Sequence, residues 1–63
     1  MAETSTRKIN ARLEREGWTK IGGGNHDKFA NLAYPHVLIL VPRHKTVSSG
    51  VARDIARKAK WVQ

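Results

Sequence analysis

The hydrophobic positions along the first part of the chain predict an amphipathic helix. Residues 6–16 are mostly good helix formers, and Ile9 and Leu13 are spaced by four, which places both on one narrow apolar face. A hydroxyl side chain among residues 4–6 would cap the start of this helix by accepting a free backbone N–H. Gly17 would end it in a left-handed conformation.

Strands are predicted at residues 18–21, 26–31 and 36–41, and the first and third of these segments are rich in β-branched, aromatic or leucine residues. The glycines and asparagine of residues 22–25 predict the turn between the first two. The third segment is an unbroken apolar run, which predicts a central or doubly covered strand. Pro42 would end it, since proline cannot donate to a ladder.

A second helix is predicted after a basic loop, with Ser48 or Ser49 as its N-cap. Its spacing gives an apolar stripe and a basic stripe. The apolar stripe consists of Val51, Ala52, Ile55 and Ala59, and the basic stripe consists of Arg53, Arg57 and Lys60. Trp61 and Val62 follow and are expected to fold back onto the edge of the sheet.

The order helix, strand, strand, strand, helix predicts an α+β fold. A three-stranded antiparallel sheet with both helices on one face would bury both helix stripes together with Trp18 or Ile21, Phe29 and one side of the third strand. This α-β-β-β-α arrangement is that of a double-stranded-RNA-binding domain. Residues 1–63 are expected to form a single domain.

Charge narrows the class of partner. Twelve Lys and Arg residues against five Asp and Glu residues give a net charge of +7, which favours nucleic acid, then an acidic protein, then an anionic membrane. The longest apolar run is far shorter than the ~20 residues of a membrane span, and the N-terminus lacks an apolar signal core. A cytoplasmic protein without a membrane segment is expected.

The candidate chemistry lies in the stretch from Gly22 to Phe29. On a strand, His26 and Lys28 share one face, and Phe29 points to the other face and into the core. RNA cleavage without a metal needs an acid and a base for the ribose 2′-OH and the leaving 5′-oxygen, and positive charge for the transition state. Histidine suits proton transfer because its ordinary pKa of ~6.5 lies near working pH. Asp27 faces away and is not expected to orient His26.

Each candidate also has a simpler interpretation. His26 could be an exposed hairpin histidine and Lys28 a solvated strand lysine. His44, in the basic loop, could supply the second acid–base group, contact a phosphate, or have no specific role. Arg53 and Arg57 could follow an RNA backbone or form a solvated helix face. The spacing of the three histidines does not indicate a metal site.

Taken in order, several short motifs resemble HicA-type toxins, the mRNA interferases of HicAB toxin–antitoxin pairs. The motifs are Gly17-Trp18 after the first helix, Gly23-Gly24-Asn25-His26, Phe29, Val41-Pro42-Arg43-His44, and the closing basic and apolar helix. The resemblance covers residues 9–61 and implies a double-stranded-RNA-binding-domain-like fold, RNA cleavage that depends on the histidine at position 26, and a HicB antitoxin that covers the active face. Gly24 stands where many relatives have serine.

The sequence therefore predicts an endoribonuclease toxin that cleaves mRNA by histidine acid–base chemistry and is inhibited by a cognate HicB-type antitoxin. His26 is the predicted catalytic residue, and no metal or cofactor is expected. The predicted RNA-binding residues are Lys28, Arg43, His44, Arg53 and Arg57. The alternatives are a non-catalytic RNA-binding module of the same fold and a module whose basic face docks on an acidic protein.

Overall fold

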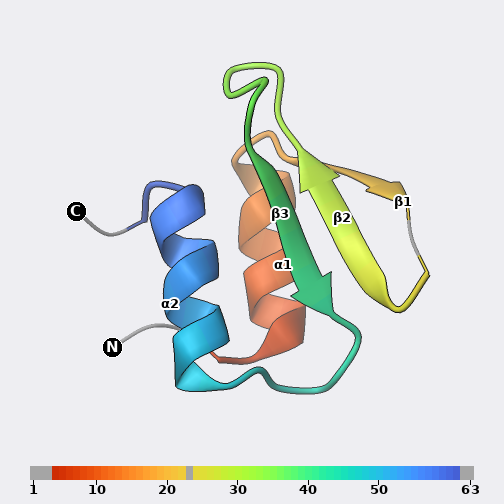
Figure 1. Cartoon of the computed structure of the whole chain (residues 1–63), viewed down its shortest axis with the longest axis vertical. Helices are drawn as coiled ribbons and strands as arrows, with labels where there is room; N and C mark the ends of the chain where they lie inside the picture. Colours follow the sequence, from red (N-terminus) through yellow and green to blue (C-terminus); the bar gives the residue numbers. More distant parts are fainter. Residues whose placement is uncertain (1–3, 23, 62–63) are drawn as a thin grey trace.

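The computed structural model describes residues 4–22 and 24–61, and it confirms the predicted order of elements and the antiparallel sheet. Both helices lie on one side of the sheet (Figure 1). The elements are α1 (Thr6–Arg15), β1 (Thr19–Gly22), β2 (His26–Ala30), β3 (Leu38–Pro42) and α2 (Ser49–Lys58). Among the described residues, no helix is long and apolar enough to cross a bilayer.

Helix α1 begins and ends where the sequence predicts. The Ser5 side chain accepts a hydrogen bond from the backbone N–H of Lys8 at 3.5 Å. At the other end Gly17 has φ +95°, a conformation that costs little without a Cβ. The next N–H, that of Trp18, donates to the carbonyl of Leu13 at 2.9 Å, and both of these side chains are buried. This left-handed end turns the chain directly into β1.

The sheet has the order β1-β2-β3, so β2 is its central strand. The prediction that residues 36–41 form a central or doubly covered strand is wrong, because β3 is an edge strand that begins at Leu38 and includes Pro42. Its outward side chains, Leu38 and Leu40, are each 42% exposed, since the helices cover only the inner face. An edge strand tolerates a terminal proline because one row of its backbone donors needs no partner within the sheet.

The core lies between the inner face of the sheet and the two helices. Trp18 is buried as predicted, whereas Ile21 is exposed. Val51 is also exposed, although it was expected on the apolar stripe of α2. From Ala52 onward, the buried residues of α2 and of its end recur every three or four positions. Val51 comes one position before Ala52 and therefore lies outside this buried stripe. The core residues are Ile9, Leu13, Trp18, Phe29, Ile39, Val41, Val47, Ala52, Ile55 and Ala59.

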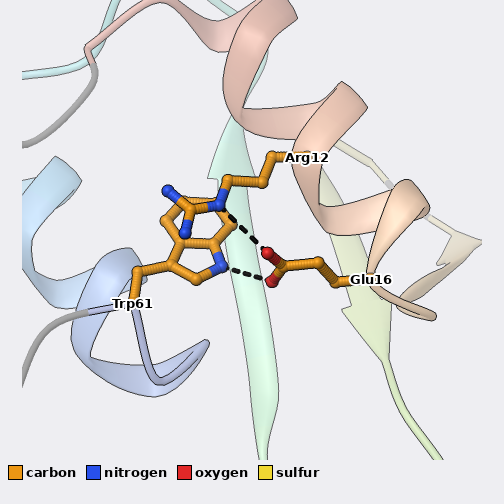
Figure 2. A network of polar contacts seen from close by, with 3 residues as sticks. All are labelled: Arg12, Glu16 and Trp61. Carbon is orange, nitrogen blue, oxygen red and sulfur yellow. Dashed lines mark hydrogen bonds and ion pairs between the residues drawn. The ribbon is translucent and has the colours of Figure 1, made fainter.

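Trp61 packs beside α1 and not on the sheet edge, which corrects the prediction for the end of the chain (Figure 2). Its indole Nε1 donates to Glu16 Oε1, and the Arg12 guanidinium lies 4.3 Å from the centre of the Trp61 ring. Arg12 Nε also donates to Glu16 Oε2 at 3.1 Å. These three side chains join the last described turn of the chain to α1. Val62 lies outside the described residues. Lys60 lies beyond the end of α2, with φ +66°.

The basic loop between β3 and α2 is tied to the start of α1. The N–H of Val47 donates to the carbonyl of Thr4, and the N–H of Thr6 donates to the carbonyl of Lys45, both at 3.0 Å. The Val47 side chain is buried in the core. Ser48 then caps α2, as predicted, by accepting from the N–H of Val51 at 3.2 Å. The loop that carries Arg43 and His44 is therefore held at its far end.

Replacing Glu16 with glutamine is expected to lower the free energy of unfolding at neutral pH but not in acid. Burial alone would raise the pKa of the Glu16 carboxyl, but hydrogen bonds from the Trp61 indole and the Arg12 guanidinium outweigh it and hold the pKa below its usual 4.5. A carboxyl with a lowered folded-state pKa adds stability above its unfolded-state pKa and loses it as the pH falls through the folded-state value.

Urea denaturation of the wild type and of Glu16→Gln, from neutral pH into acid, measures the difference in their free energies of unfolding. Glutamine keeps the acceptor oxygen for Trp61, so the difference isolates the charge. A stability difference that stays constant from neutral pH into acid would contradict the assignment.

Candidate functional site

The turn between β1 and β2 presents His26 on the outer face of the sheet. Gly24 has φ +55°, and the chain then enters β2 at His26, whose side chain is exposed. Phe29, three residues on, is completely buried on the inner face, as the strand alternation predicts. Lys28 is exposed on the same outer face as His26.

The register between β2 and β3 places His26 against the end of the neighbouring strand. His26 is directly opposite Pro42, and the chain continues into Arg43 and His44. The start of one strand and the end of the other form an open depression of about 440 Å³. Its lining residues are Asn25, His26, Pro42, Arg43 and His44. Three residues that the sequence singled out, on two separate segments, thus meet at one end of the sheet.

A buried carboxylate lies on the other face of the same strand. Asp27 Oδ1 accepts a hydrogen bond from Arg43 Nε at 3.0 Å, and Asp27 Oδ2 lies 3.9 Å from Lys20 Nζ. Asp27 therefore does not orient His26, in agreement with the alternation, but it does hold the arginine of the depression. Sequence reasoning missed this contact. The signal for it was an acidic residue at an inward position of a strand, which needs a cationic partner.

The depression combines groups that transfer protons with a group that binds anions. In the part of the chain that the structure describes, neither the His26 nor the His44 side chain has a hydrogen-bond or ion-pair partner, so their ring nitrogens are open to a ligand. Arg43 supplies a permanent positive charge whose planar fork matches a phosphate. Within the same residues, no group of three or more His, Asp or Glu side chains could hold a metal ion. The chemistry that this arrangement supports is acid–base transfer at a bound phosphate.

Comparison with known proteins decides the family. A family model described as "HicA toxin of bacterial toxin-antitoxin" matches residues 6–61, which include every helix and strand. The chain belongs to the HicA toxin family. No curated protein and no solved structure matches it. The protein is thus a toxin of a toxin–antitoxin system, and the family implies an antitoxin partner.

Three of the predicted RNA-binding residues of this HicA-family toxin lie outside the depression. Lys28 lies two residues along the outer face from His26, opposite Leu40 of β3. Arg53 and Arg57 are exposed on α2, which packs on the inner side of the sheet. The depression therefore collects His26, Arg43 and His44, and the helix arginines belong to a different surface.

A more apolar groove lies toward the opposite end of β2. It is lined by Gly17, Thr19, Ile21, Ala30, Asn31, Leu32, Tyr34, Pro35 and Val37. The Tyr34 ring stacks on Trp18 with a centroid distance of 5.8 Å and an interplanar angle of 9°. The described lining of the groove contains no histidine and no acidic or basic side chain.

The left-handed turn before His26 predicts a specific response to substitution. Gly24→Ala is expected to destabilise the toxin by about 1 kcal/mol, since a Cβ at φ +55° strains the backbone although nothing lies within 4 Å of it. Gly24→Asn is expected to cost less, because asparagine tolerates this conformation.

Urea unfolding midpoints test both variants, with Gly50→Ala as the matched control. Gly50 lies in the first turn of α2 and also has nothing within 4 Å of an added Cβ, so alanine there is expected to stabilise by roughly 0.5–1 kcal/mol. If both glycine-to-alanine changes shifted stability in the same direction, the conformational explanation would be wrong.

Proposed function

We propose that this HicA-family toxin is an endoribonuclease that cleaves mRNA in the cytoplasm, with His26 as its catalytic residue and without a metal or cofactor. One observation carries the proposal: an exposed, unpartnered imidazole lies in the same depression as Arg43 and His44. The family membership adds that the protein acts as a toxin.

The reaction uses the ribose 2′-OH as an internal nucleophile. A histidine removes the 2′-OH proton, the 2′-oxygen forms a bond to phosphorus, and the bond from phosphorus to the 5′-oxygen breaks. A proton delivered to the 5′-oxygen completes the step, leaving a 2′,3′-cyclic phosphate and a 5′-hydroxyl. His26 performs one of these two proton transfers, and His44 is the candidate for the other. Arg43 stabilises the negative charge that develops on the phosphate oxygens.

The remaining cations extend the RNA-binding surface. Lys28 follows His26 along the outer face, so it contacts the RNA backbone next to the cleaved phosphate. Arg53 and Arg57 contact RNA only if the bound RNA is long enough to extend from the depression around the protein to α2. The net charge of +7 supports binding of a polyanion through such contacts.

His26→Gln is expected to reduce RNA cleavage by roughly 100-fold or more, the usual contribution of a general acid or base. Labelled RNA is incubated with the purified toxin in the presence of a chelator, and fragments and their ends are measured. His36→Gln is the matched control, since His36 is exposed in the loop before β3 and outside the depression. It is expected to cleave at the wild-type rate.

The same experiment separates the alternatives. Equal cleavage by the wild type and His26→Gln would remove His26 from the mechanism. Loss of cleavage on adding the chelator would show that a metal takes part. Salt-sensitive RNA binding without fragments would favour a non-catalytic RNA-binding module of the same fold.

We infer further that a HicB-type antitoxin covers the outer face of the sheet and inhibits by occlusion of His26. This face carries apolar side chains that the helices leave uncovered, chiefly Leu38 and Leu40, beside Lys28. A partner that buries these leucines would also cover the depression at the end of the sheet.

The double variant Leu38→Lys and Leu40→Lys is expected to weaken antitoxin binding by roughly tenfold or more, as at an interface centre. Both side chains are half exposed, so the fold is expected to survive. Titration calorimetry with the cognate antitoxin measures the affinity. Leu32→Lys, at a fully exposed loop position, is the control and is expected to bind normally. Equal affinities for the double variant and the control would contradict the interface.

A further inference from the structure

Asp27 places a carboxylate where the sheet otherwise buries apolar side chains. Asp27 is 8% exposed, and its side chain shares the inner face of β2 with that of Phe29. Directly opposite on β3 is Val41, which is completely buried. Burying a carboxylate in such surroundings is costly unless it is paired and hydrogen-bonded. A residue that opposes the apolar pattern at this position calls for an explanation beyond packing.

The sheet register explains how Asp27 meets its partners. Residues two positions along from a directly opposed pair are diagonal neighbours, roughly 7–8 Å apart and within reach of long side chains. Asp27 is opposite Val41, so Arg43 is its diagonal neighbour at the end of β3. On the other side Lys20 is opposite Phe29 and is the second diagonal neighbour of Asp27. The two cations thus approach the carboxylate from both flanking strands.

The two contacts are unequal in geometry. Arg43 Nε donates to Oδ1 at 3.0 Å, which is a charge-assisted hydrogen bond, whereas Lys20 Nζ lies 3.9 Å from Oδ2 and forms only an ion pair. The carboxylate thus fixes the arginine more firmly than the lysine.

Arg43 is held in a way that leaves most of its guanidinium open. Only Nε is engaged, its terminal nitrogens have no other partner among residues 4–22 and 24–61, and the side chain is 55% exposed. The same arginine lines the depression with His26 and His44. Terminal nitrogens fixed in this manner form a fork suited to two oxygens of a phosphate.

We propose that Asp27 is a positioning residue that holds Arg43 through Nε and so fixes its terminal nitrogens as an RNA phosphate site beside His26. This inference rests on the proposed function for its ligand, RNA. It assigns Asp27 no contact with the RNA itself. It also makes the arginine irreplaceable by lysine, because the single amine of a lysine cannot bind Asp27 and a phosphate in the same fixed geometry.

The proposal predicts that removing the negative charge of Asp27 changes RNA affinity in the direction opposite to that expected from overall charge alone. Removing a negative charge from a basic RNA-binding protein would tighten RNA binding through the overall field. If Asp27 positions Arg43, Asp27→Asn instead weakens binding, because Arg43 is then held by a weaker neutral hydrogen bond. Arg43→Gln removes the phosphate contact altogether and is expected to weaken binding by roughly tenfold or more.

The test measures binding of a short, fluorescein-labelled single-stranded RNA by fluorescence anisotropy in the His26→Gln background, so that no cleavage occurs. Circular dichroism first establishes that each variant is folded under the assay conditions. The expected result is weaker binding by Asp27→Asn and by Arg43→Gln, with little further loss in the double variant. The slope of log affinity against log salt is expected to fall in each variant by about 0.7, the contribution of one single-strand phosphate contact.

Lys20→Gln is the matched control, because it removes the other partner of Asp27 without altering the depression. It is expected to keep RNA affinity within about twofold, because the hydrogen bond between Asp27 and Arg43 remains and the lost charge lies outside the depression, where salt screens it. Arg43→Lys gives a second measurement if Asp27→Asn fails to fold, and it is expected to bind as weakly as Arg43→Gln.

Several outcomes would overturn the proposal. These are unchanged or tighter binding by Asp27→Asn, independent and additive losses in the double variant, or wild-type binding by Arg43→Lys. Failure of the proposed function is distinguishable from these. A toxin that binds RNA with the expected variant pattern but never cleaves it would refute the endoribonuclease activity and leave the role of Asp27 intact.

Discussion

The pairing of β2 with β3 is the constraint on which the rest of the toxin depends. With His26 opposite Pro42 and Phe29 opposite Ile39, one set of side chains enters the core and the other forms the outer face. A slip of one residue would exchange the two sets, turning Phe29 to solvent and His26 into the core. The same register makes Arg43 the diagonal neighbour of Asp27. Core packing and the candidate site are therefore set by one alignment of two strands.

Local features of the fold were predictable because the residues that determine them are close in sequence. Ser48 at the start of α2 and Gly17 at the end of α1 satisfy backbone groups within a few residues of themselves. The outward direction of His26 and the inward direction of Phe29 follow from strand alternation alone. The predicted α+β order and the placement of the catalytic candidate at the start of the second strand rest on such short-range rules.

Features that depend on distant segments were not predictable in the same way. The apolar run of β3 is compatible with a central or an edge strand, and only the pairing with β2 shows that it lies at the edge. Trp61 contacts Glu16 at the end of α1 across 45 residues of sequence, and Asp27 contacts Arg43 across 16 residues. Such contacts depend on the packing of α1, α2 and the sheet, which no local propensity encodes.

The backbone bonds between the start of α1 and the loop before α2 close a ring of chain that contains α1 and the three strands of the sheet. Val47 donates to Thr4, and Thr6 donates to Lys45, just beyond Arg43 and His44. The amide protons of Thr6 and Val47 therefore exchange with solvent only when this ring opens. Their hydrogen-exchange rates report how firmly the loop that carries His44 is held in the free toxin.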